Sequence, residues 1–111
     1  MKLKTTLAIA ALATLSSVAF GAGDPERGKT LFATCGACHG PNAEGMEALN
    51  APKLAGQEEW YTVRQLENFK NGVRGNNPRD TYGMQMAPMA QTLPDAQAMQ
   101  DVAAYIRSLG K

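Results

Sequence analysis

Both cysteines and the only histidine of this chain fall within five consecutive residues, Cys35, Gly36, Ala37, Cys38 and His39. Cysteines with this spacing lie on one face of a helical turn, so both sulfurs can reach the same object. The histidine follows directly, and its imidazole can turn toward that object from one side. The spacing C-x-x-C-H is the attachment signature of a c-type haem, in which the sulfurs bond to the porphyrin and the imidazole binds its iron.

Three other uses of this motif fit the chain less well. A redox dithiol of the thioredoxin type requires a βαβ unit, and the sequence has no such pattern. A disulfide between Cys35 and Cys38 would close too small a loop to add much stability. A zinc site would have three ligands here and no obvious fourth. The motif therefore favours one covalent haem c, attached through both cysteines, with His39 as an axial iron ligand.

The first residues have the pattern of a signal peptide. Lys2 and Lys4 precede an uncharged run at residues 7–18 that is rich in alanine and leucine, and the small residues Ala19 and Gly21 follow it. The run is shorter than the ~20 apolar residues that span a membrane. We expect cleavage after Gly21, with Ala19 as a second possible site and an uncleaved N-terminal anchor as the alternative.

Cleavage after Gly21 divides the chain into a signal peptide, residues 1–21, and a single domain, residues 22–111. Lysine and arginine total 11 and aspartate and glutamate 10, so the chain has no basic surface suited to nucleic acid. Lys2 and Lys4 leave with the leader, which makes the mature domain nearly neutral. We expect this domain in the periplasm, without stable membrane insertion.

Three segments of the mature domain are predicted to be helical. The first begins after Asp24, a good N-cap, with Pro25 at the first helical position, and continues toward Cys35. The second covers residues 58–71 and the third residues 95–109. The second segment has an apolar stripe at helical spacing, which we expect to be buried: Trp60, Val63, Leu66, Phe69 and Val73. In the third segment, the apolar residues that share one face are Met99, Val102, Ala103, Ile106 and Leu109.

The two connections, residues 40–57 and 72–94, are long for so short a chain and rich in proline, glycine and asparagine. Neither shows the alternation of a β-strand. Loops of this length usually have a function or surround something. The predicted fold is therefore all-α, with three main helices and two long loops wrapped around the haem.

The second axial ligand of the iron must come from another residue type, because no second histidine is present. A methionine thioether is the natural choice, and the second loop contains Met84, Met86 and Met89. Pro88 favours an extended conformation for Ala87, which would direct Met86 and Met89 to different sides. Local reasoning leaves all three methionines open.

The mature domain resembles class I c-type cytochromes over its whole length, and most closely the haem domains of the cytochrome c4 family. The matching pieces are residues 35–40 (CGACHG), residues 52–57 (PKLAGQ), Tyr61 with Gln65, Met86 with Leu93, and residues 101–106 (DVAAYI). The resemblance implies the cytochrome c fold. It also selects Met86, since the ligand methionine of such domains lies seven residues before the leucine that precedes the last helix.

Further roles follow from the same resemblance. The carbonyl of Pro52 is expected to accept a hydrogen bond from His39 Nδ1 and so to orient the ring. Gly28 and Phe32 match a pair at which the first helix admits an aromatic residue of the last, here Tyr105. The residues expected as haem-pocket wall or core, two roles that spacing does not separate, are Leu54, Tyr61, Leu66 and Ile106.

Two features depart from the family pattern. Cytochrome c4 proteins carry two haem domains in tandem, whereas this chain has one attachment motif. Pro94 stands where the family usually has a serine or threonine that caps the last helix. We expect Thr92 or Asp95 to satisfy those amides instead.

The resulting functional prediction is a periplasmic one-electron carrier and not an enzyme, because two axial ligands would leave the iron no open position. A quinol:cytochrome c reductase would be its donor and a terminal oxidase or reductase its acceptor. The expected contact surface is small and uncharged, with Ala37, Ala87, Pro88 and Ala90 beside the haem edge. The alternatives are a haem-bearing subunit of a larger oxidase or dehydrogenase, and a haem enzyme or sensor with a labile sixth ligand.

Overall fold

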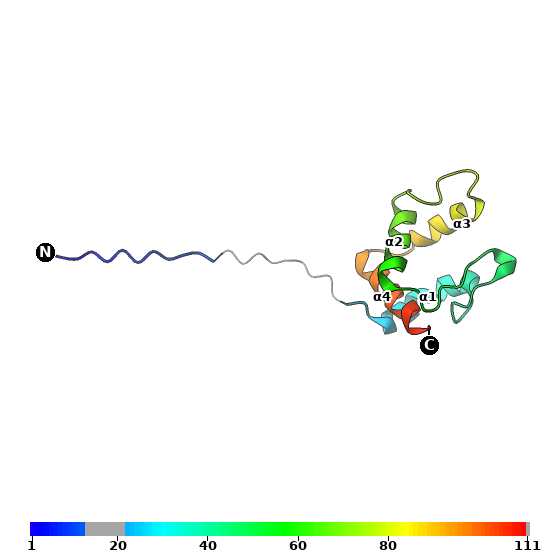
Figure 1. The fold of residues 1–111 in the computed structure, drawn as a ribbon, viewed down its shortest axis with the longest axis horizontal. Coiled ribbons are helices and arrows are strands. Elements are labelled where there is room, and N and C mark those ends of the chain that lie inside the picture. Colours follow the sequence, from blue (N-terminus) through cyan, green and yellow to red (C-terminus); the bar gives the residue numbers. More distant parts are fainter. Residues whose placement is uncertain (13–21, 111) are drawn as a thin grey trace.

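The computed structural model describes residues 1–12 and 22–110, and the two expected cleavage sites, after Ala19 and after Gly21, lie outside this part. Residues 1–12 form no helix or strand, and the folded body follows them (Figure 1). Its elements are α1 (Pro25–His39), the short 3₁₀ helix η1 (Glu47–Leu49), α2 (Glu59–Lys70), α3 (Thr81–Ala90) and α4 (Ala96–Ser108). The prediction of an all-α fold is confirmed. Among the described residues, no helix is both long and apolar enough to cross a membrane.

Helices α1 and α4 cross at a point where their backbones touch. A Cβ atom at Gly28 would overlap the backbone carbonyl of Asp101 and come within 2.9 Å of the Cβ of Tyr105. One turn further along α1, Phe32 is buried, and its ring centroid lies 5.4 Å from that of Tyr105. The expected helix crossing is therefore confirmed: glycine is the residue that permits this approach.

The core lies between these crossed helices and α2, which also packs against α3 (Figure 1). In the expected stripe of α2, Leu66 and Phe69 are buried. Trp60 and Val73 are 60% and 74% exposed, so the stripe is only partly buried and this part of the prediction is wrong. Trp60 faces outward from the first turn of α2, and Val73 lies beyond the last turn, where the chain has already left the core.

Helix α3 was not expected, because Pro88 lies inside it. Its N-cap is Asp80, whose side chain accepts a hydrogen bond from the backbone of Gly83 at 3.0 Å. Pro88 has no N–H and so removes one backbone hydrogen bond of the helix, a loss that the cap and the packing of α3 against α2 offset. The prediction of an extended Ala87 is wrong, and Met86 and Met89, three residues apart on a helix, lie on one face.

The N-caps of α1 and α4 are the aspartates that the sequence predicts. Asp24 precedes α1 and accepts hydrogen bonds from the backbone of Glu26 and Arg27. Asp95 caps α4 by accepting from the backbone of Ala98 at 2.8 Å, so Asp95 takes the place of the family's serine or threonine. Thr92 instead donates its hydroxyl to the Met89 carbonyl.

Candidate functional site

The C-x-x-C-H motif forms the last turn of α1. Cys35 is half-buried and Cys38 is exposed, and neither forms a disulfide. Burial, together with the neighbouring Cys38, raises the pKa of the Cys35 thiol against the opposing effect of a backbone hydrogen bond. The helix ends immediately after His39, at Gly40, which has a φ of 87°. This positive φ suits glycine, and the chain turns away from the motif here.

The imidazole of His39 is 7% exposed and is held from one side. Its Nδ1 lies 2.8 Å from the carbonyl oxygen of Pro52. Because a carbonyl oxygen only accepts, Nδ1 carries the hydrogen, and Nε2 retains a lone pair for a metal. The hydrogen bond implied by the resemblance is therefore confirmed, while the ligand role of His39 remains a prediction.

The loop that carries Pro52 is itself fixed by backbone hydrogen bonds. The carbonyl of the buried Ala43 accepts from Leu54 N at 2.9 Å and from Ala55 N at 3.0 Å. On the motif side, Gly45 N donates to the His39 carbonyl at 2.7 Å. These bonds join the turn that follows the motif to the loop that orients the imidazole. The backbone of this loop therefore fixes the Pro52 carbonyl that orients the ring.

The motif opens on a cavity of about 430 Å³, within the size range of sites for small molecules and cofactors. The structure brings every sequence-predicted site residue to its wall: Cys35, Cys38, His39, Pro52, Leu54, Tyr61 and Met86. The apolar part of the wall is formed by Leu54, Leu66, Phe69, Val102 and Ile106. Met89 also lines the cavity, whereas Met84 does not and is exposed. Geometry therefore separates Met84 from the other two candidates.

These residues fit a large apolar group that carries an iron. Two thiols, one imidazole and thioether sulfurs meet in one cavity, and these are the atoms that bind haem and its iron in c-type cytochromes. In the described part of the chain, no group of three or more histidine, cysteine, aspartate or glutamate side chains could hold a bare metal ion. The donor set therefore matches a haem and not an isolated cation.

Sequence reasoning missed several polar residues of the wall: Gln57, Gln65, Arg74, Asp80 and Tyr82. Gln57 and Gln65 were noted only as parts of the family pattern. Arg74 follows the end of α2 in a loop, where residue type alone carries no signal for a site. Asp80 and Tyr82 reach the wall because they lie at the start of α3, a helix that the sequence pattern does not predict.

The expected uncharged contact surface is only partly present. Ala37 and Pro88 are exposed, but Ala90 is 1% exposed and Ala87 packs against the core. The helical conformation of α3 turns these two alanines toward the core, so Ala90 is removed from the surface and Ala87 is partly covered. That part of the prediction is wrong.

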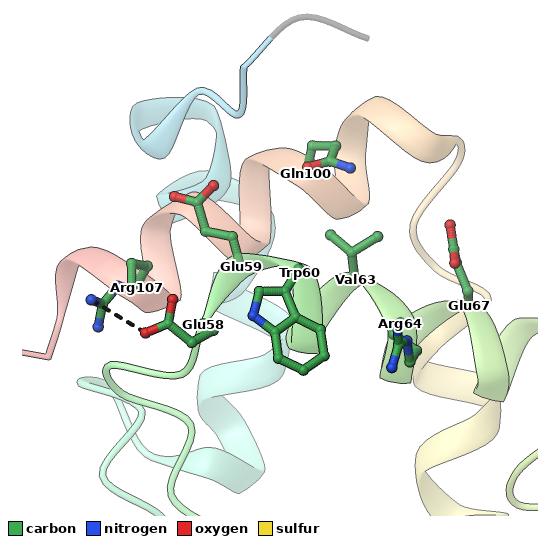
Figure 2. Close-up of a pocket in the computed structure, with 8 residues that line it drawn as sticks. All are labelled: Glu58, Glu59, Trp60, Val63, Arg64, Glu67, Gln100 and Arg107. Carbon is green, nitrogen blue, oxygen red and sulfur yellow. Dashed lines mark ion pairs between the residues drawn. The ribbon is translucent and has the colours of Figure 1, made fainter.

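A second hollow, of about 650 Å³, lies on the other face of α2 and contains none of the motif residues. Trp60, Val63, Arg64 and Glu67 line it at helical spacing, and α4 contributes Gln100 and Arg107 (Figure 2). The guanidinium carbon of Arg64 lies 5.0 Å from the centroid of the Trp60 ring, and Arg107 pairs with Glu58 at 3.4 Å. Without cysteine, histidine or methionine, this hollow has no donor for a haem.

Comparison with known proteins agrees with this geometry. The family profile of cytochrome c matches residues 25–110, and the chain belongs to the cytochrome c family. Cytochrome c4 of Stutzerimonas stutzeri is 40% identical over 85% of this chain and 45% of its own length. Cytochrome c-554(548) of Halomonas halodenitrificans is 36% identical over 78% of this chain and 98% of its own length. A protein named thiosulfate dehydrogenase electron acceptor, from Stutzerimonas stutzeri, is 37% identical over 68% of this chain and 31% of its own length.

The resemblance to class I c-type cytochromes near cytochrome c4 is thereby confirmed. The chain spans about half the length of the cytochrome c4 relatives it matches. Membership of the family implies haem c bound covalently, and Cys35 and Cys38 are the cysteines of the attachment motif.

Proposed function

We propose that this chain is a one-electron carrier in which His39 and Met86 are the axial ligands of haem c. The observation that carries the proposal is that both side chains line one cavity, with the His39 ring fixed by Pro52. The bound haem supplies an iron that alternates between its ferric and ferrous states. The chain carries an electron and transforms no substrate, because the two side chains leave the iron no open position.

The residues around the cavity have two tasks. Pro52 accepts the hydrogen bond from Nδ1 of His39, which would leave Nε2 for the iron and make the ring a stronger ligand. Leu66, Phe69 and Ile106 line the wall with apolar groups that keep water away. A thioether ligand and a dry surrounding both favour the ferrous state, which suits a carrier of high reduction potential.

We further propose export of the domain to the periplasm after removal of residues 1–21. The charged start, the apolar run and the small residues before residue 22 support this. The donor would be a quinol:cytochrome c reductase and the acceptor a terminal oxidase or reductase. A relative named as an electron acceptor of a dehydrogenase supports redox proteins as partners.

The axial ligand is tested by replacing each methionine of the cavity wall. Met86→Ala should abolish the weak long-wavelength sulfur-to-iron band of the oxidised protein and allow carbon monoxide to bind the reduced protein. Met89→Ala is the matched control, because Met89 lies on the same face of α3 and lines the same cavity. It should retain the band and exclude carbon monoxide. Absorption spectra of both redox states measure both properties.

If only Met89→Ala loses the band, the second axial ligand is Met89 and not Met86, and the assignment of His39 as the first ligand still stands. A wild-type protein that lacks the band and binds carbon monoxide would contradict the carrier proposal and favour a haem enzyme or sensor. Co-purification with other subunits at fixed stoichiometry would favour a subunit of a larger complex.

A further inference from the structure

Arg74 occupies a defined place on the wall of the haem cavity. It follows the last turn of α2, and among the described residues it is the only lysine or arginine that lines this cavity. Its guanidinium carbon lies 4.6 Å from the centroid of the Phe69 ring, and Nη1 donates a hydrogen bond to Gln65 Oε1 at 2.9 Å. Phe69 and Gln65 both line the cavity as well. Arg74 is an exposed residue, and these two contacts hold its guanidinium beside the cavity.

This cation has no acidic partner in the described part of the chain. The ion pairs there join Arg27 with Asp101 and Arg107 with Glu58. Asp80, the carboxylate that lines the cavity, accepts a hydrogen bond from Gly83 as the N-cap of α3. The bond to Gln65 uses one of the five N–H donors of a guanidinium. Arg74 thus presents unused donors and an unpaired positive charge at the site of the cofactor.

We propose that Arg74 binds a propionate carboxylate of haem c and thereby raises the reduction potential of the iron. The proposal rests on the attachment of haem at Cys35 and Cys38. The two propionates are the anionic substituents of a haem, and a guanidinium fork matches a carboxylate with two parallel hydrogen bonds. Reduction adds one negative charge at the iron, so a fixed cation nearby stabilises the ferrous state. Gln65 acts as a positioning residue, since it orients Arg74.

The test compares midpoint potentials of the haem-loaded protein in which one of two arginines is replaced. Arg74→Gln removes the positive charge at the cavity. Arg64→Gln is the matched control: it removes the same charge from the outer face of α2, where Arg64 stacks on Trp60 (Figure 2). For Arg74→Gln, the ratio of ferrous to ferric protein at a fixed solution potential should fall about tenfold, which corresponds to about 59 mV for a one-electron couple. Arg64→Gln should change this ratio much less.

The variant Arg74→Lys separates the effect of the charge from that of the guanidinium geometry. It retains the charge but replaces the fork with a single ammonium group, so its potential should lie between those of the wild type and Arg74→Gln. Equal potentials for Arg74→Gln and Arg64→Gln would overturn the proposal. If Arg74→Gln does not fold, a wild-type potential for Arg74→Lys overturns it.

The absorption spectrum of each sample separates this proposal from the axial assignment. An intact sulfur-to-iron band with an unchanged potential in Arg74→Gln contradicts only the role of Arg74. A wild-type protein without that band contradicts the ligation by Met86, whereas the comparison of the two arginine variants still decides the propionate contact.

Discussion

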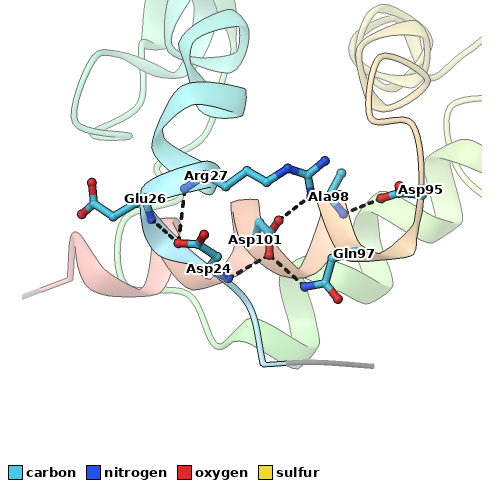
Figure 3. Close-up of polar contacts among 7 residues, drawn as sticks. All are labelled: Asp24, Glu26, Arg27, Asp95, Gln97, Ala98 and Asp101. Carbon is cyan, nitrogen blue, oxygen red and sulfur yellow. Dashed lines mark hydrogen bonds and ion pairs between the residues drawn. The ribbon is translucent and has the colours of Figure 1, made fainter. Parts of the chain in front are cut away.

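Asp101 is a carboxylate in α4 whose side chain is 1% exposed, in a place where an unpaired charge would be costly. It accepts hydrogen bonds from the backbone of Asp24 at 2.8 Å, from Gln97 at 2.9 Å and from Arg27 at 2.6 Å (Figure 3). Burial raises the pKa of Asp101, whereas these hydrogen bonds and the charge of Arg27 lower it. The lowering effects together are larger, so the pKa lies below its usual value. The residue therefore ties the start of α1 to α4 as an ionised group.

This arrangement makes stability depend on pH. Because the folded-state pKa of Asp101 is lowered, its stabilisation is present above the unfolded pKa of about 4 and is lost as pH falls through the folded value. Asp101→Asn should lose about 1.5–3 kcal/mol at pH 7, the usual contribution of hydrogen bonds to a charged group. The variant should also lose less stability than the wild type on going to pH 3. Urea denaturation midpoints at both pH values measure this.

The control for that experiment is Glu47→Gln, an exposed acid at the start of η1. Glu47→Gln should be as stable as the wild type at pH 7, and it should lose as much stability as the wild type on going to pH 3. If Asp101→Asn and the wild type lose the same stability between pH 7 and pH 3, groups other than Asp101 govern the acid sensitivity.

At the scale of single residues, the attachment motif is predicted from the sequence alone, and the family resemblance adds apolar residues of the wall such as Leu54 and Ile106. Most of the polar residues of the wall are not predicted. Cys35, Cys38 and His39 are found because their chemistry depends on a fixed local spacing. Arg74 and Asp80 reach the cavity only through the way α2 and α3 pack together, which no local pattern encodes. The choice between Met86 and Met89 depended on a family spacing, and both side chains in fact line the cavity.

At the scale of the helices, caps and apolar spacing were enough to predict three of the four α-helices in residues 22–110. Helices α2 and α4, at Glu59–Lys70 and Ala96–Ser108, begin and end within a residue of the predicted segments. Helix α1 continues to His39, so the whole attachment motif is helical. Helix α3 was missed because Pro88 and Gly83 are poor helix formers, and its stability comes from its cap and from packing, which outweigh propensity.

The crossing of α1 and α4 gives a prediction at this scale. Gly28→Val should separate the two helices, because even a Cβ there would overlap the Asp101 carbonyl. The expected loss is roughly 1–3 kcal/mol, typical of overpacking. Ala33→Val, which introduces the same side chain at an exposed position of α1, is the control for helix propensity and should cost much less. Denaturation midpoints measure both, and equal midpoints would mean that the helices can move apart freely.

At the scale of the whole molecule, α2 separates two different surfaces. One face lines the haem cavity with Leu66 and Phe69, and the other carries Trp60 and Arg64 over the second hollow. The start of α1 is fixed to α4 by Asp24 and Asp101. Acidic and basic residues are nearly equal in number, so no single sign of charge dominates the molecule.

This balance predicts that the encounter between two molecules responds weakly to salt. The full chain has a formal charge of +1. Removal of the proposed signal peptide would take away Lys2 and Lys4 and make the remaining domain slightly acidic, and two haem propionates would add to this. Long-range steering acts over a Debye length that falls from ~30 Å at 0.01 M salt to ~3 Å at 1 M, and it changes rates by roughly 10–10³-fold where fields are strong. Electron self-exchange between the ferric and ferrous protein, measured by magnetic resonance line broadening, should therefore change less than about tenfold over that range. A steep rise with salt would instead reveal like charges gathered at the contact surface, where the exposed Ala37 and Pro88 predict an uncharged one.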